Sequence, residues 1–213
     1  MRYDPLINRL SEDLKPVRPR RVGIDLAIVA TICAIELAFF FMMGAARPDM
    51  PMMMKQPTFW WRLESLGLIA LISGTLAILS FSPTYSPRRG LRWITGIAVF
   101  CLALGLCINA GMDDFMSILR RLDWADGVQC AGKIILLSIP PVIGLGVLMR
   151  RGAPTDTKGS ALLVGLAAAA WGALVFVFAC PFNDPLYIAV WYTVGCGIVT
   201  LLSRAILPRI ARW

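Results

Sequence analysis

The chain has 213 residues, of which 58% are apolar and only 16% charged, and its formal net charge is +8. An average soluble domain has about a quarter charged residues, so this composition excludes an ordinary soluble protein and predicts a polytopic membrane protein. Histidine is absent, which removes the usual general base and the commonest metal ligand, and the six cysteines include no CxxC pair.

Residues 1–22 form a short basic leader that we expect to be a soluble segment in the cytoplasm. Asp4 and Pro5 are typical of a helix start, and Pro16 predicts that the helix ends near Lys15. The apolar residues between them fall on one helical face: Leu6, Ile7, Leu10 and Leu14. A helix of about ten residues is unstable alone in water. We therefore expect this face to bind either the membrane surface or a groove on a partner protein.

Six apolar runs follow, and each is long enough to cross a bilayer as a helix of about twenty residues. They show no strand-like alternation, so the sequence predicts an all-α fold with six transmembrane helices in residues 23–207. The predicted spans are 23–46, 63–82, 93–112, 128–149, 159–180 and 187–207. Pro140-Pro141 predicts a kink in the fourth span, and small residues from Gly165 to Gly172 predict close helix contacts on the fifth.

The basic residues predict the orientation in the membrane. Fifteen lie in the leader, around Arg88 and Arg150, and near the C-terminus, whereas five lie in the other connections: Arg47, Lys55, Arg62, Arg120 and Arg121. Cytoplasmic segments carry the excess of basic residues, so both termini are predicted to be cytoplasmic, with residues 208–213 as a short tail.

In this topology two cysteines share the outer boundary of the membrane. Cys130 begins the fourth span, and Cys180 ends the fifth, just before the turn at 183–185. The remaining cysteines lie deeper in their spans: Cys33, Cys101, Cys107 and Cys196. The outer pair is either a thiol switch for an oxidant or a soft metal, a permanent disulfide, or two inert buried thiols. A disulfide requires Cα atoms within about 7 Å of each other.

Two further features of the spans and loops are open to more than one interpretation. The Met50–Met54 segment contains four methionines, whose thioethers bind Cu(I) and oxidise readily, but we favour a mobile loop at the lipid interface. Glu36 lies in the middle of a span, where an acid either bonds to a neighbouring helix or marks a proton path. No second acid is predicted at its depth, so the sequence gives a proton relay little support.

No catalytic constellation is evident in the sequence. Nucleotide-binding loops, nucleophile elbows and HExxH patterns are absent, so we expect no enzymatic activity, no cofactor and no direct contact with nucleic acid. The sequence gives no firm metal site, and only Cys130 and Cys180 are candidates for metal ligands.

Four segments together resemble the negative-regulator-of-sigma-F family, which consists of bacterial anti-sigma factors with six membrane helices. The segments are Leu6 to Arg18 of the leader, Cys130 through Pro140 to Pro154, Cys180-Pro181 to Trp191-Tyr192, and the ending Arg212-Trp213. Residues 42–62 and 113–127 have no matching pattern.

The resemblance implies a location in the bacterial inner membrane and a mechanism. The leader would sequester an extracytoplasmic-function sigma factor, and outward-facing cysteines, here Cys130 and Cys180, would sense stress and release it. The resemblance places Pro16, Val17 and Arg18 with Leu10 and Leu14 in the sigma-binding segment. It leaves open the stimulus, which is either an oxidant or a metal, and the oligomeric state.

Two functions of other classes are alternatives. A small transporter or channel with Glu36 on its pathway would need polar faces on several spans. A membrane thiol oxidoreductase would need turnover with a quinone or a dithiol, for which isolated cysteines are poorly suited.

Overall fold

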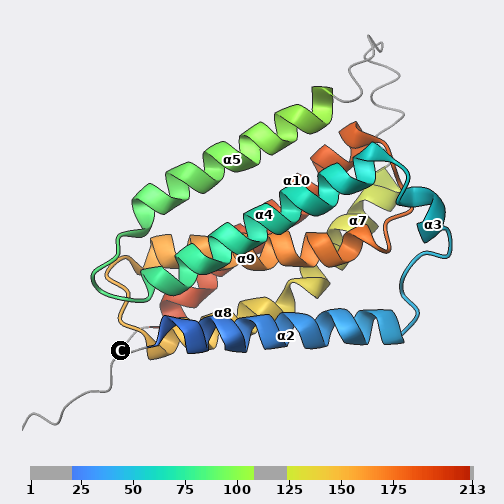
Figure 1. The fold of residues 1–213 in the computed structure, drawn as a ribbon. Helices are drawn as coiled ribbons and strands as arrows, with labels where there is room; N and C mark the ends of the chain where they lie inside the picture. The colour runs from blue at the N-terminus through green and yellow to red at the C-terminus, as the bar shows by residue number, and fades with distance from the viewer. Residues whose placement is uncertain (1–20, 108–123, 212–213) are drawn as a thin grey trace, which may run out of the picture.

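The computed structural model describes residues 21–107 and 124–211, and every regular element in these two ranges is a helix (Figure 1). The prediction of an all-α fold is therefore confirmed for this part of the chain. The helices are α2 (Val22–Met42), α3 (Met50–Met53), α4 (Pro57–Ser80), α5 (Pro87–Cys107), α7 (Trp124–Leu137), α8 (Ile139–Arg151), α9 (Thr157–Val177) and α10 (Pro185–Ile210). The predicted sigma-binding residues of the leader lie outside the described residues.

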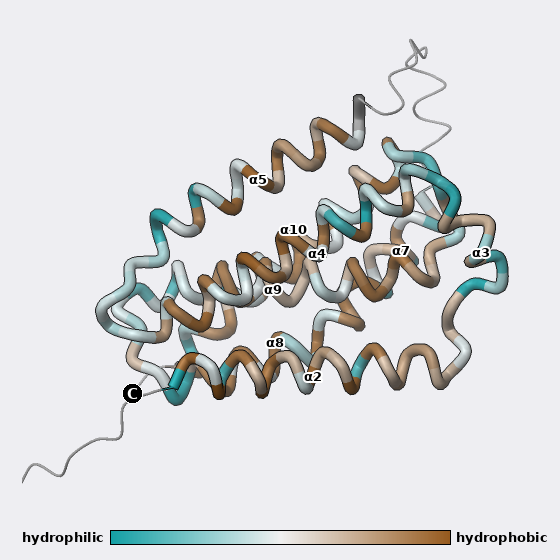
Figure 2. The backbone as a smooth tube through the Cα atoms, in the orientation of Figure 1, coloured by the Kyte–Doolittle hydropathy of each residue, from teal (hydrophilic) through white to brown (hydrophobic). Residues whose placement is uncertain are grey.

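Within the described ranges, five helical segments are long and apolar enough to cross a membrane. They are α2, α4, α7 together with α8, α9 and α10. The remaining predicted span, the third at 93–112, overlaps α5, whose first turns carry Arg88, Arg89 and Arg92, and its last five residues are outside the described part. Figure 2 shows apolar residues along the helices and hydrophilic residues gathered mainly near their ends.

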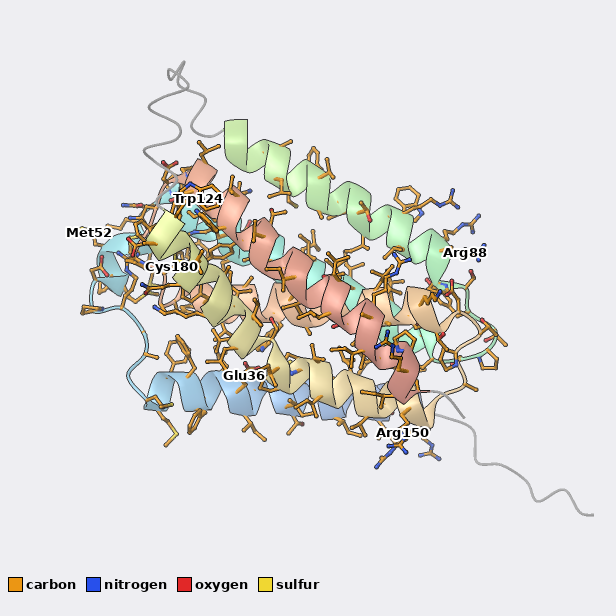
Figure 3. All side chains as sticks on the ribbon, turned by 180° about the vertical axis from the view of Figure 1, so that it is seen from behind. Glu36, Met52, Arg88, Trp124, Arg150 and Cys180 are labelled. Carbon is orange, nitrogen blue, oxygen red and sulfur yellow. The ribbon has the colours of Figure 1, made fainter. Side chains whose placement is uncertain are left out.

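The long helices alternate in direction, so the bundle has two distinct ends (Figure 1). Arg88 and Arg150 lie at one end, which we call the basic end, and Cys180, Met52 and Trp124 lie at the other, which we call the cysteine end (Figure 3). Glu36 lies between the two ends (Figure 3).

Helix α9 is the centre of the bundle and packs chiefly against α4 and α10. Its 18-residue apolar window is 78% buried, compared with 11% for α2. Small residues allow this burial because they let neighbouring backbones approach. A Cβ atom at Gly165 would lie 2.7 Å from the Thr200 Cα of α10, and one at Gly172 would lie 2.8 Å from the Ser138 backbone nitrogen. The close contacts predicted for the fifth span are confirmed.

The fourth apolar run forms two helices that meet at Ser138, which confirms the predicted kink. Pro140 and Pro141 have no backbone N–H and cannot continue the hydrogen bonds of α7. The Ser138 hydroxyl donates to the Ile134 carbonyl at 2.7 Å, and α8 then begins at Ile139.

The predicted helix boundaries differ from the observed ones mostly at the cysteine end. α2 ends at Met42 rather than near Ala46 because the chain turns at Gly44, whose φ is +65°. α4 begins at Pro57, six residues before the predicted span, and α9 ends at Val177, three residues before Cys180. Cys180 is therefore in a loop and not on a helix.

The close contact of α9 with α10 predicts that alanine substitutions at two glycines have different effects on stability. Gly165→Ala should destabilise the protein by about 1–3 kcal/mol because its Cβ meets backbone that cannot move aside. Gly132→Ala on α7, where no atom lies within 4 Å of the added Cβ, should be neutral or stabilise the helix by up to about 1 kcal/mol. Thermal unfolding of the detergent-solubilised proteins measures both. Equal melting temperatures for the two variants would contradict the proposed close contact.

Candidate functional site

The hairpin at residues 178–184 joins α9 to α10 at the cysteine end. Phe178 caps the C-terminus of α9, and the Asp184 carboxylate accepts a hydrogen bond from the Leu186 backbone N–H at 3.0 Å, which caps α10. Pro185 takes the first position of α10, where the missing N–H costs nothing. The turn predicted from Asn183-Asp184-Pro185 thus lies between two capped helices.

The structure brings the two predicted outer cysteines together. Cys130 of α7 and Cys180 of the hairpin are 3% and 0% exposed, their thiols interact, and both are free thiols. Cys33 and Cys101 are also free, but each lies on a different helix, away from this pair. The two thiols predicted at one boundary are therefore neighbours in the structure, and the choice between a switch, a disulfide and inert thiols stays a prediction.

Aromatic rings surround the thiol pair and separate it from solvent. The Tyr187 hydroxyl lies 3.5 Å from the Cys130 sulfur, and the Phe182 ring packs on the Tyr187 ring with 4.4 Å between centroids. Trp191 lies further along α10, 6.4 Å from Tyr187 between ring centroids.

The methionine segment contributes to the same cluster. Residues Met50–Met53 form the short helix α3, and Met53 is only 2% exposed among Cys130, Cys180 and their aromatic neighbours. Met52 and Met54 are exposed. The interpretation of the whole segment as a mobile loop at the lipid interface therefore does not hold for Met53, which is buried in the same apolar cluster as the thiol pair.

Arg47 ties the hairpin to the connection between α2 and α4. Its NH1 donates to the Cys180 carbonyl at 2.6 Å, and its backbone N–H donates to the Phe178 carbonyl at 3.0 Å. The guanidinium also pairs with the exposed Asp49 carboxylate at 2.6 Å, which lowers the pKa of Asp49. Arg47 therefore clamps the hairpin from outside the bundle.

A second arginine holds the hairpin from inside. Arg62 of α4 is 1% exposed, and its NH1 donates to the Phe182 carbonyl at 3.2 Å, while its Nε donates to the Thr58 carbonyl at 3.3 Å. The sequence predicted Arg47 and Arg62 only as basic residues of the outer connections. The available signal was the position of Arg62, a basic residue directly before the second predicted span on the side where such residues are disfavoured.

Buried polar atoms without a hydrogen-bond partner gather at this end. In the part of the chain that the structure describes they are Thr58 Oγ1, Arg62 NH2, Trp191 Nε1 and Tyr192 OH, with Glu36 Oε1 as a fifth atom elsewhere. Natural proteins satisfy the great majority of such atoms, so a group of exceptions at one end of the bundle calls for a physical explanation.

The surroundings make Cys180 more acidic than an ordinary thiol. The Cys130 thiol, acting as a hydrogen-bond donor, is the main cause that lowers the pKa of Cys180 to about 6. Burial opposes this shift, and the positive charge of Arg62 supports it. Thiolates are the reactive form of cysteine, so a lowered pKa favours reaction at Cys180.

Glu36 lies on α2 and is not part of the thiol site. The Trp171 Nε1 of α9 donates to its Oε2 at 3.1 Å, so the acid bonds to a neighbouring helix. This is the first of the two roles that the sequence left open for it.

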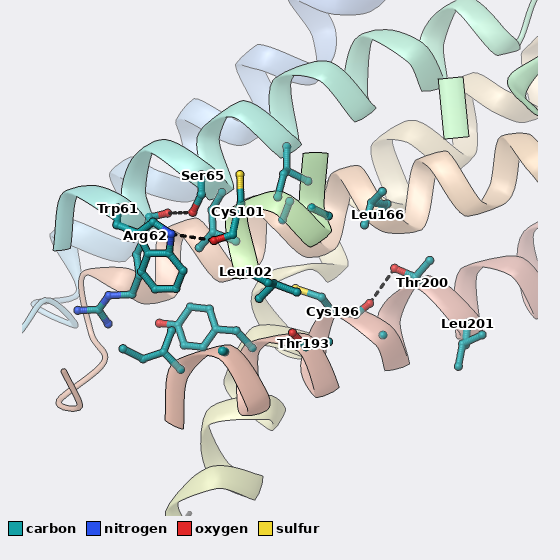
Figure 4. Close-up of a pocket in the computed structure, with 18 residues that line it drawn as sticks. Trp61, Arg62, Ser65, Cys101, Leu102, Leu166, Thr193, Cys196, Thr200 and Leu201 are labelled. Carbon is teal, nitrogen blue, oxygen red and sulfur yellow. Dashed lines mark hydrogen bonds between the residues drawn. The ribbon is translucent and has the colours of Figure 1, made fainter. Parts of the chain in front are cut away.

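The largest apolar cavity near the site, about 460 Å³, lies between α4, α5, α9 and α10. Trp61, Cys101 and Cys196 line it, and the Trp61 indole donates to the Cys101 carbonyl at 3.0 Å. Figure 4 shows the Arg62 guanidinium extending away from Cys101 and Cys196 rather than toward them. Within residues 21–107 and 124–211, no three His, Cys, Asp or Glu side chains converge as metal ligands would.

The Arg47 clamp predicts how accessible Cys180 is. Arg47→Met removes the charge-assisted hydrogen bond to the Cys180 carbonyl, so opening of the hairpin should become about tenfold more frequent. The rate at which a maleimide labels Cys180 in intact membranes at fixed pH measures this. Lys55→Met, at an exposed basic residue of the same connection, is the control. Equal labelling rates in the two variants would mean that Arg47 does not restrict access.

Comparison with known proteins matches nearly the whole chain to one family. The family model described as "Negative regulator of sigma F" covers residues 10–213. The anti-sigma-F factor NrsF of Caulobacter vibrioides (strain NA1000 / CB15N) is 31% identical over 223 residues, which span 100% of both chains. No solved structure matches the chain. The resemblance noted in the sequence is thus confirmed, and the chain belongs to the negative regulator of sigma F family of anti-sigma factors.

Proposed function

We propose that this protein is a multi-pass anti-sigma factor of the bacterial inner membrane that holds an extracytoplasmic-function sigma factor through its leader. The leader, residues 1–22, faces the cytoplasm and precedes a six-helix sensor domain, residues 23–207, with the tail also cytoplasmic. An oxidant or a soft metal acts on Cys130 and Cys180 at the outer face and releases the sigma factor. The observation that carries the proposal is the buried thiol pair at the end of the bundle opposite the basic end.

The placement of charge supports this orientation. Arg88 and Arg150 lie at the basic end, which would face the cytoplasm under the positive-inside tendency, and the start of α2 lies at the same end (Figures 1 and 3). The leader would therefore emerge into the compartment that contains sigma factors.

A continuous series of packed helices supports transmission from the thiols to the leader. Cys130 lies on α7, which meets α8 at Ser138, and α8 packs mainly against α9 and α2. α2 begins at Val22, directly after the leader. A disulfide requires sulfurs about 2.05 Å apart, so its formation would pull α7 toward the hairpin and shift α8 against α2. Such a route needs two alternative packings of α7 and α8.

Co-purification from membranes tests the sigma-binding face. Leu10→Asp/Leu14→Asp places two charges on the apolar face of the leader and should abolish recovery of the sigma factor encoded beside this gene. The control Asn8→Asp/Lys15→Gln changes the net charge equally on the opposite face and should retain it. If the sigma factor is recovered with both variants, its binding surface is not the apolar face of the leader. If it is lost with both variants, binding depends on the net charge of the leader and not on this face. If even the wild-type protein recovers no sigma factor, the proposed function fails.

A reporter of sigma-dependent transcription tests the thiols. Cys130→Ser should leave the sigma factor sequestered and abolish induction by an oxidant, because no disulfide can form with Cys180. Cys33→Ser, at a free thiol of α2 outside the pair, should induce as the wild type does. Full induction in Cys130→Ser would exclude the thiol switch and leave the anti-sigma role intact.

A further inference from the structure

Arg62 is a buried charge without an opposite charge from the described carboxylates. It is 1% exposed, its NH2 has no hydrogen-bond partner among the described residues, and none of their carboxylates forms an ion pair with it. Removing a guanidinium from water is costly unless an anion or a full set of acceptors compensates it. In the structure its acceptors are two uncharged carbonyl oxygens. One negative charge nearby would therefore compensate the positive charge of the guanidinium.

The group in position to supply that charge is the Cys180 thiol. Arg62 NH1 lies 3.2 Å from the Phe182 carbonyl oxygen, and the Cys180 sulfur lies 3.7 Å from the same oxygen. Both groups donate to this one oxygen, so the thiol lies beside the guanidinium as a second donor to the Phe182 carbonyl. The Tyr192 hydroxyl, which also has no partner of ordinary length in the described part, is a further neighbour of this thiol.

Cys130 has different surroundings. Its sulfur contacts the Tyr187 hydroxyl at 3.5 Å, and the nearest cation on its own helix is Lys133, whose side chain is exposed. An exposed ammonium is screened by solvent and stabilises a thiolate far less than a buried guanidinium does. The two cysteines are therefore chemically unequal.

We propose that Arg62 is the positioning residue that holds Cys180 as a thiolate, that a small hydroperoxide oxidises Cys180 first, and that Cys130 then closes the disulfide. This deepens the proposed sensor function by assigning each thiol a role and by naming the class of oxidant. Loss of Cys180 prevents the first step, loss of Cys130 prevents the second, and loss of Arg62 slows the first.

The chemistry balances with a hydroperoxide as the two-electron oxidant. The Cys180 thiolate attacks the terminal oxygen of R–O–O–H, the O–O bond breaks, and Cys180 becomes a sulfenic acid while the alkoxide leaves and takes a proton from water. The Cys130 sulfur then attacks the Cys180 sulfur, and the S–OH bond breaks with release of water. The sum is two thiols and one hydroperoxide converted to one disulfide, one alcohol and one water.

Charge disfavours a divalent metal at the same place. Two thiolates and a divalent cation are neutral together, so adding the metal would leave the Arg62 charge buried without compensation. One thiolate beside Arg62 is neutral without any metal. A small uncharged hydroperoxide also needs less opening of the hairpin to reach a sulfur that is 0% exposed.

The first test traps the sulfenic acid in the full-length protein in lipid nanodiscs. With hydrogen peroxide and dimedone, Cys130→Ser should be labelled at Cys180, whereas Cys180→Ser should not be labelled at Cys130. Mass spectrometry of the peptides distinguishes the two sites from the other four cysteines. Labelling of Cys130 at an equal rate would overturn the assignment of roles.

The second test compares arginine variants in the Cys130→Ser background. Arg62→Met should slow dimedone labelling at pH 7 by about tenfold or more, since a rise of one unit in the pKa of a thiol lowers its thiolate fraction up to tenfold. Arg62→Lys should restore much of the rate. Arg47→Met, which removes a guanidinium from the outside of the same hairpin, should not slow it. Equal rates for wild type and Arg62→Met would overturn the proposal.

The pH dependence of the dimedone labelling rate distinguishes an electrostatic role of Arg62 from a structural one. The charged and titratable groups around Cys180 are Arg62 from α4, Cys130, Lys133 and Asp126 from α7, Tyr187 and Tyr192 from α10, and Arg47 from the connection. In the Cys130→Ser background, the midpoint of the rate profile should rise from wild type to Arg62→Met and remain low in Arg62→Lys. A structural role alone would change the rate at every pH and leave the midpoint in place, which would overturn the proposal.

The tests of Arg62 and of the thiols do not depend on whether the protein binds a sigma factor. Sulfenic acid formation is measured without sigma, and sigma co-purification is measured without peroxide. A correct thiol assignment with no sigma binding would refute the proposed function alone, and intact sigma binding with no effect of Arg62 would refute this inference alone.

Discussion

The close contact between Gly172 of α9 and the end of α7 is the constraint on which the site depends. Ser138 and the Ile134 carbonyl lie where a Cβ of residue 172 would be, at 2.8 Å for the Ser138 nitrogen and 2.9 Å for the carbonyl oxygen. Ile134 is one helical turn after Cys130 and on the same face of α7, so this contact sets the depth of Cys130. Cys180 follows Gly172 by one and a half turns of α9 and its short cap. One helix contact thus fixes both sulfurs relative to each other.

The two arginines give the hairpin opposite properties. Arg47 is partly buried, with 13% of its side chain exposed: its bond to the Cys180 carbonyl is part-buried, and its pairing with Asp49 is exposed to solvent and screened. Arg62 is buried, where the absence of water strengthens its field at Cys180 and makes its unpartnered NH2 costly. In the proposed mechanism, the bonds of Arg47 would limit access to the thiol, and Arg62 would support its thiolate form together with the Cys130 thiol.

The sequence predicted the features that depend on local chemistry. The all-α class, the turn before Pro185, the break near Pro140-Pro141 and the small-residue contacts of α9 all follow from backbone donors, side-chain volume and apolar runs. The placement of Cys130 and Cys180 at one boundary followed from the alternating direction of the spans, because Cys130 begins the fourth apolar run and Cys180 ends the fifth. The roles of Arg47, Arg62 and Met53 did not follow, because each depends on contacts with residues more than a hundred positions away or on another helix. Periodicity carries no information on such pairs.

In the proposed mechanism, the break between α7 and α8 determines how a movement of the thiols would be transmitted to the basic end. A continuous helix would tilt as a rod and move both ends of the bundle together. The missing N–H groups of Pro140 and Pro141 make Ser138 a pivot, so α7 can approach the hairpin while α8 keeps its contacts with α9. Under the proposed mechanism, the movement that reaches α2 would be a rotation of α8 about its buried side, where Leu145, Leu148 and Met149 pack into the core. Because α2 is the least buried of the five candidate membrane spans in the described ranges, it would offer the least resistance to that rotation.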